Sequence, residues 1–190
     1  MDAILYEDKT FENEDYSERK LAKGEYVDCA FIACNFSKSD LSNSIFMDCQ
    51  FTGCNFQLAV LGNTGIKNIE FVNCKLMGIN FSECNNFLFS ASFKNCILDY
   101  CSFFQKKMAK TSFIDCSMKE VDFAETDLAQ AIFKNCDLLN ASFNRTNLEK
   151  ADFRTARNYS LDPELNKIKK AKFSYQDIAG LLTKYNIVIE

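Results

Sequence analysis

The chain contains no histidine and no tryptophan, and only one proline and six glycines among its 190 residues. Without histidine it lacks the commonest general base and the usual partner of a serine or cysteine nucleophile. No apolar stretch approaches the ~20 residues that a membrane-spanning helix needs. The acidic start has no basic flank followed by an apolar run, so we expect no signal peptide, a cytoplasmic location and reduced thiols. The sequence therefore predicts neither an enzyme nor a membrane protein.

Clustered positive charge is also missing from most of the chain. Lys and Arg number 22 against 26 Asp and Glu, for a net charge of −4. Residues 12–153 hold 19 acids and 14 bases, whereas residues 154–190 hold four acids and seven bases. Because contact with phosphates needs clustered Lys and Arg, this acidic body argues against direct binding to nucleic acid or to anionic lipid.

Phenylalanine is abundant, with 19 residues, and it recurs with a period of five. Large apolar residues occupy every fifth position from Leu21 to Phe81. The stretch CNNFLF then shifts the frame by two residues at positions 84–88, and the period resumes from Leu88 to Phe153. A period of five fits neither a helix nor a strand. It predicts a chain that turns a corner every five residues, with one large side chain on each side pointing inward.

A small residue stands two positions before each large one, and all ten cysteines occupy this slot. They are Cys29, Cys34, Cys49, Cys54, Cys74, Cys84, Cys96, Cys101, Cys116 and Cys136. Structural zinc sites prefer two to four residues between cysteines, a spacing that this slot does not give. Neighbours in one column could approach within disulfide range, but a reducing compartment argues against that bond. We therefore expect small buried core residues, with no metal and no cofactor.

The stretch TDLAQAIFKNCDLLNASFNRTNLEKADF, residues 126–153, resembles the A-(D/N)-L-x-x consensus of pentapeptide-repeat proteins. The resemblance covers roughly residues 11–153 and implies an all-β solenoid, a right-handed quadrilateral β-helix in which four pentapeptides make one coil. We expect this rod to occupy residues 1–153. Its 27 sides between Leu21 and Phe153 make nearly seven coils, stacked about 4.8 Å apart.

In such a rod, residues 20 apart form inward columns, and residues ten apart face each other across the bore. Burying each large side chain contributes roughly 1.5–3 kcal/mol before entropy is counted. The predicted core contains Phe31, Phe51, Phe71, Phe93, Phe103, Phe113, Phe123, Phe133, Phe143 and Phe153.

Beyond a basic connector with a turn at Asp162-Pro163, the stretch SYQDIAGLLTKYN predicts a short C-terminal α-helix capped by Ser174 and ending at Asn186. The final NIVIE predicts a small strand. This tail, within residues 154–190, resembles the Qnr-type quinolone-resistance and microcin-immunity branch of the family, in which it joins two rods end to end. The resemblance implies a homodimer formed by Tyr175, Ile178, Leu181, Leu182, Tyr185, Ile187 and Ile189. The alternative is that the helix only caps its own rod.

The same resemblance implies a function: a rod that imitates DNA, binds bacterial type II topoisomerase (DNA gyrase or topoisomerase IV) and protects it from quinolones or peptide toxins. Duplex DNA carries about 20 charges over ~34 Å, which the mixed charges of this rod do not match, so only a local patch could act in this way. The candidate patch contains Glu120, Asp122, Glu125, Asp127 and Asp137. Lys106, Lys107 and Lys110 would repel a basic groove. The alternative interpretation of these carboxylates is a solvated face.

Two further questions stay open in the sequence. The frame shift at 84–88 is either a tolerated slipped corner or a bulge that presents Asn85, Asn86 and Phe87 to a partner. It is shorter than the loops that project from Qnr-type rods. The alternative function is a generic pentapeptide-repeat scaffold that binds some other protein and has no link to topoisomerase.

Overall fold

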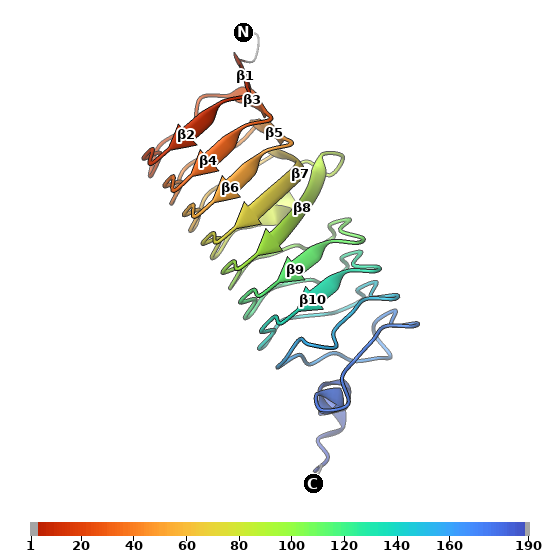
Figure 1. Ribbon diagram of the computed structural model, residues 1–190. Coiled ribbons are helices and arrows are strands. Elements are labelled where there is room, and N and C mark those ends of the chain that lie inside the picture. Colours follow the sequence, from red (N-terminus) through yellow and green to blue (C-terminus); the bar gives the residue numbers. More distant parts are fainter. Residues whose placement is uncertain (1–3, 189–190) are drawn as a thin grey trace.

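The computed structural model describes residues 4–188, which form a rod wound from parallel strands (Figure 1). The path through the sheet runs β1-β3-β5-β7-β6-β4-β2, and β8, β9 and β10 continue from β7. The strands are β1 (Ile4–Glu7), β2 (Thr10–Glu12), β3 (Gly24–Val27), β4 (Ala30–Ile32), β5 (Ile45–Met47), β6 (Gln50–Thr52), β7 (Gly65–Val72), β8 (Phe89–Lys94), β9 (Ser112–Ile114) and β10 (Ile132–Lys134). The chain is thus a right-handed quadrilateral β-helix, as predicted.

The register between turns is 20 residues along most of the rod. Phe31 pairs with Phe51, and Phe113 pairs with Phe133. Between β7 and β8 the step is 22 residues, because Phe71 pairs with Phe93 and the register shifts after Ile66. The two extra residues are therefore absorbed within a single turn, and the columns continue in line beyond it.

The corners of the rod are made by residues in the left-handed backbone conformation. Within residues 4–188, 27 non-glycine residues have positive φ, and most lie two positions after an inward-pointing large residue. Asn and Asp, which tolerate this conformation best, supply about half of them. Most corners also make a hydrogen bond to the next turn: the N–H of Asp28 donates to Met47 O at 3.0 Å, and that of Lys38 donates to Gln57 O at 2.8 Å.

A continuous stack of phenylalanine rings fills one side of the bore. Neighbouring rings are 4.6–5.4 Å apart between centroids and nearly parallel. The stack contains Phe11, Phe31, Phe51, Phe71, Phe93, Phe113, Phe133, Phe153 and Phe173. On the opposite side, Phe81, Phe103, Phe123 and Phe143 form a second stack, and the two stacks meet edge to face across the bore. All ten phenylalanines predicted for the core are buried.

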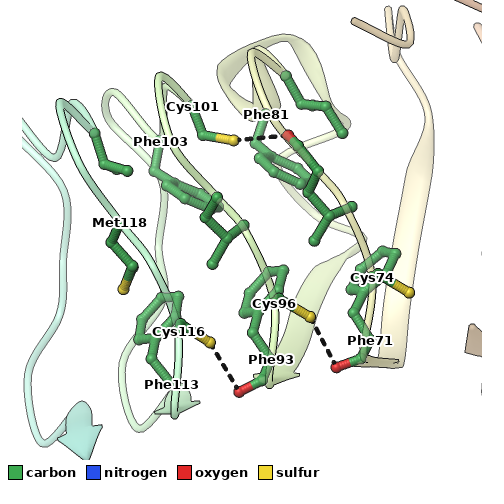
Figure 2. Close-up of a cluster of buried hydrophobic side chains, with 14 of the residues drawn as sticks. Phe71, Cys74, Phe81, Phe93, Cys96, Cys101, Phe103, Phe113, Cys116 and Met118 are labelled. Carbon is green, nitrogen blue, oxygen red and sulfur yellow. Dashed lines mark hydrogen bonds between the residues drawn. The ribbon is translucent and has the colours of Figure 1, made fainter. Parts of the chain in front are cut away.

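The small slot beside each ring explains why cysteine, serine and threonine replace one another there. All ten cysteines are free and buried. Most donate a hydrogen bond from Sγ to the carbonyl oxygen of a large residue in the preceding turn, as Cys54 does to Phe31 O at 3.3 Å. Thr126 donates to Phe103 O from the same slot at 2.8 Å. Figure 2 shows this hydrogen bond for Cys96, which donates to Phe71 O, and for Cys116, which donates to Phe93 O.

The rod extends beyond the predicted boundary at Phe153. Parallel bridges join Asn147 to Lys167 and Asp152 to Lys172. Phe173 stacks on Phe153 at 5.4 Å between centroids. The segment expected to be a basic connector is therefore another turn of the rod, and the boundary predicted at Phe153 was placed one turn too early. The five-residue spacing of Ile168 and Phe173 carried this signal, which the Asp162-Pro163 turn obscured.

The tail forms two short 3-10 helices, η2 (Ile178–Leu181) and η3 (Thr183–Tyr185), in place of a longer α-helix. A third, η1 (Phe81–Glu83), lies before the frame shift. Ser174 Oγ accepts the Asp177 N–H at 3.1 Å, and Asn186 ends the helices in the left-handed conformation, as expected from the sequence. The predicted strand is not formed by the described residues Ile187 and Val188, and the remainder of it lies outside them. No helix within residues 4–188 is long and apolar enough to cross a membrane.

The stacked core predicts a large difference between inward and outward phenylalanines. Replacing buried Phe113 with alanine should lower the free energy of unfolding by about 3–5 kcal/mol, because the cavity lies between two rings that are held in register. Replacing Phe104, which is 38% exposed, should cost less than about 1 kcal/mol. Denaturant unfolding followed by circular dichroism measures both. Equal losses for the two variants would contradict the stacked core.

Candidate interaction surface

The frame shift produces a bulge that is anchored from inside the rod. Lys106 occupies a small slot, two positions before Met108, and is 1% exposed. Its Nζ donates to Cys84 O at 2.5 Å and to Asn86 Oδ1 at 2.6 Å. The ammonium also lies 5.3 Å from the centroid of the Phe89 ring, and burial lowers the pKa of Lys106. Lys106 was expected on the surface, where it would repel a basic groove, and that expectation is wrong.

The bulge presents one large apolar side chain to solvent. Phe87 is fully exposed, and its N–H donates to Asn85 Oδ1 at 3.0 Å in a tight turn. Phe89, rather than Leu88, packs against the core, where it pairs with Ile66 and meets Phe81 edge to face. The period was expected to resume at Leu88, so the inward position is displaced by one residue. The hydrogen bonds from buried Lys106 anchor this bulge, and Phe87 projects from it into solvent.

The five carboxylates of the predicted patch lie on two neighbouring turns but around several sides of the rod. One turn contains Glu120, Asp122, Glu125 and Asp127. Asp137 lies in the following turn, where it forms a parallel bridge with Ser117. Two of the five have cationic neighbours. Arg145 lies 3.7 Å from Glu125, and Lys119 and Arg157 each lie 3.9 Å from Asp137. The structure does not gather the five groups on one flat face.

Several aspartates just before an inward residue also have a structural role. Asp122 Oδ1 accepts the N–H of Ala124 at 2.9 Å, and Asp127 Oδ1 accepts that of Ala129 at 3.1 Å. Asp40 makes the same bond to Ser42, and hydrogen bonds from Ser42 lower the pKa of Asp40 to about 2. An asparagine can accept the same bond, so the turn needs the oxygen and does not need the negative charge.

The tail residues predicted to form a dimer divide into two groups. Leu181 packs against the core, and Gly180 O accepts the N–H of Leu161 at 3.0 Å, so η2 covers the end of its own rod. Lys184 Nζ lies 2.8 Å from Asp162 Oδ1. The others remain accessible: Tyr175, Ile178, Tyr185 and Ile187 are exposed, Leu182 is half-buried, and Ile189 lies outside the described residues. The tail therefore both caps the rod and leaves an apolar surface.

Within residues 4–188, the cavity in the core of the rod is too small for a ligand. A cavity of about 10 Å³ lined by Leu41, Phe46 and Phe51 is the size of one small solvent molecule at most. Among the described residues, no three His, Cys, Asp or Glu side chains gather in a way that could hold a metal ion. Binding must therefore use the outer surface of this part of the chain.

The anchor of the bulge can be tested by substitution. Lys106→Met keeps most of the buried volume but removes the donor to Cys84 O and Asn86 Oδ1, so the free energy of unfolding should fall by about 1–3 kcal/mol. Amide hydrogen exchange at Phe87 and Leu88 should become faster. Lys107→Met, at an exposed position, is the matched control and should change stability by less than about 0.5 kcal/mol. Unchanged exchange in the Lys106 variant would contradict the anchoring role.

Comparisons with known proteins agree with this geometry. A family model described as the pentapeptide repeat region matches residues 25–103, 86–162 and 106–181. No curated protein matches the sequence. A trypsin-treated variant of QnrB1, a plasmid-mediated fluoroquinolone resistance protein, has a similar structure, with a TM-score of 0.63 and 17% identity over 99% of this chain and 98% of that one.

Two other solved structures are more distant. Full-length QnrB1 gives a TM-score of 0.46 with 19% identity over 96% of this chain and 100% of that chain. HetL, a pentapeptide-repeat protein involved in regulating heterocyst differentiation in the cyanobacterium Nostoc, gives 0.42 with 16% identity over 90% and 84%. The family model covers most of the rod that the strands and stacked rings define. The chain therefore belongs to the pentapeptide-repeat family.

Proposed function

We propose that this chain is a non-catalytic cytoplasmic rod that binds a bacterial type II topoisomerase, DNA gyrase or topoisomerase IV, and protects it from quinolones or peptide toxins. The observation that supports this most is the likeness of the whole rod to QnrB1, a fluoroquinolone resistance protein, at a TM-score of 0.63. The apolar tail at the C-terminal end, which resembles the Qnr-type and microcin-immunity branch, supports the same proposal.

The binding mode would combine shape with local negative charge. A rod of stacked turns offers outward carboxylates at intervals of about 4.8 Å, against one charge per ~1.7 Å in duplex DNA. Of the five predicted carboxylates, Glu120, Asp122 and Asp127 have no ion-pair partner within residues 4–188. These three are the groups that could steer the rod into a basic groove. The exposed Phe87 would add an apolar contact.

A supercoiling assay tests the proposal. Added protein should inhibit purified gyrase or topoisomerase IV, or protect it from a quinolone or a peptide toxin, at micromolar concentration. A triple variant, Glu120→Gln, Asp122→Asn and Asp127→Asn, should need about tenfold more protein, because the turn bonds remain while three charges are lost. Asp15→Asn with Asp40→Asn removes two charges from the same kind of turn elsewhere and is the control. No effect of the unaltered protein on either enzyme would favour the generic scaffold.

We also propose that the tail joins two copies of the chain. Replacing Tyr175 and Val188 with serine alters exposed apolar side chains and leaves the contact of Leu181 with the core in place. Light scattering should then give the variant half the molar mass of the unaltered protein, because the end-to-end contact is lost. An equal molar mass for both proteins would leave the tail as a cap only.

A further inference from the structure

Nine residues follow one corner of the rod from end to end, one in each turn. They are Asp8, Asp28, Asp48, Asn68, Ser90, Lys110, Gln130, Lys150 and Lys170, and we call this column the corner strip. Every member is exposed, and all except Ser90 have φ between 51° and 65°. The N–H of most members donates to the residue just before the next member, as Asp8 does to Val27 O at 3.1 Å and Lys110 to Ala129 O at 2.8 Å. The register between neighbouring turns therefore places these nine residues in one column.

The charges of the corner strip are sorted along the rod. Three aspartates occupy the N-terminal end, and three of the four C-terminal positions are lysines. The chain as a whole has the same asymmetry, since residues 1–89 contain 13 acidic and 7 basic residues, whereas residues 90–190 contain 13 acidic and 15 basic ones. Because Ser90 is the fifth of nine members, the strip has an acidic half and a basic half of equal length.

Neither half of the strip forms an ion pair with another residue in the described part of the chain. The left-handed conformation gives the aspartates a conformational reason to be there, since Asp and Asn are enriched at positive φ. The lysines have no such reason. Lys110, Lys150 and Lys170 hold the same conformation without a side chain that favours it.

An exposed aromatic side chain lies beside the midpoint of the strip. Phe87 precedes Ser90 by three residues, so it lies within about 10 Å of it along the chain. It is fully exposed on the bulge that Lys106 anchors. Exposed aromatic residues at the centre of a polar surface are typical of the residues that dominate protein interfaces. Ser90 itself is held by Asn68, whose N–H donates to Ser90 Oγ at 2.8 Å.

We propose that the corner strip is a self-complementary surface on which a second copy of the chain docks side by side and antiparallel. A two-fold axis through Ser90 places Asp8 opposite Lys170 of the second copy and Asp28 opposite its Lys150, and the same contacts recur on the other side of the axis. Asp48 meets Gln130, and Asn68 meets Lys110.

The opposed charges of the two copies select the antiparallel arrangement, because parallel rods would place aspartate against aspartate and lysine against lysine. Eight steps of about 4.8 Å give a contact roughly 38 Å long. Phe87 of both copies lies near the axis. The contact uses residues other than those of the tail, and it does not depend on the proposed function.

Site-specific cross-linking of the full-length protein tests the geometry. Ser90→Cys places a thiol on the two-fold axis, whereas the ten native thiols are at most 3% exposed and should not react. Mild oxidation should link the variant into a disulfide dimer, seen by non-reducing electrophoresis. Ser142→Cys, at an exposed position on the side opposite the main phenylalanine stack, is the matched control and should give about tenfold less dimer. Equal cross-linking of the two variants would overturn the proposal.

Charge exchange tests the pairing. In the Ser90→Cys protein, Asp28→Lys or Lys150→Asp alone replaces two attractive contacts with repulsive ones and should lower cross-linking about tenfold. The two substitutions together should restore it, because each lysine again faces an aspartate. The double variant exchanges two corner residues and so keeps the amino-acid composition and net charge. Circular dichroism checks that every variant is folded.

Mixing two chains with opposite charge reversals tests the pairing independently of the double variant. A chain with Asp8→Lys and Asp28→Lys should not cross-link to itself, and neither should a chain with Lys150→Asp and Lys170→Asp. A mixture of the two, each carrying Ser90→Cys, should form mixed dimers, and added salt should weaken them. Cross-linking that is indifferent to all these reversals, or absent from the mixture, would overturn the antiparallel strip.

Discussion

The structure depends on one backbone constraint, a left-handed residue at nearly every corner. A conformation with positive φ is unfavourable for most side chains, yet 27 non-glycine residues adopt it within residues 4–188. At most rod corners the cost is offset by a hydrogen bond from that residue's N–H to the next turn, as at Lys38. The corner sets the length of each side at five residues, and this length brings residues 20 apart into columns. Stacked rings, buried thiols and the corner strip all follow from that alignment.

The slot beside each inward ring accepts side chains of different polarity and size. Beside each inward ring, the slot needs a small group and can use a hydrogen-bond donor to the carbonyl of the preceding turn. Cys54 and Thr126 supply that donor, whereas the buried methyl group of Ala131 supplies none. Lys106 enters the same slot only because the bulge opens a carbonyl and an amide oxygen to its ammonium. A charge is therefore buried where the repeat is interrupted.

Most of the fold could be predicted from spacing, because a period of five has a direct geometric meaning. The phenylalanine columns, the buried cysteines and the two-residue shift were all visible in that period. Lys106 was missed because charge was given more weight than position, although it stands two residues before Met108 as every slot residue does. The last turn was missed because Tyr159 and Leu161 break the period before Ile168 restores it. The candidate site was less predictable: Arg145 and Arg157 lie a full turn from the carboxylates they accompany, and only the register brings them together.

The two ends of the rod differ, and the difference gives the molecule a mechanical polarity. At the C-terminal end, η2 closes the last turn through Leu161 and Gly180. At the other end, β1 and β2 are the terminal strands of the sheet path and each pairs on one side only. Every turn contacts only its neighbours. Unfolding would therefore begin at β1 and β2 and propagate toward the C-terminal end one turn at a time. At the bulge, the hydrogen bonds of buried Lys106 would oppose further unfolding along the rod.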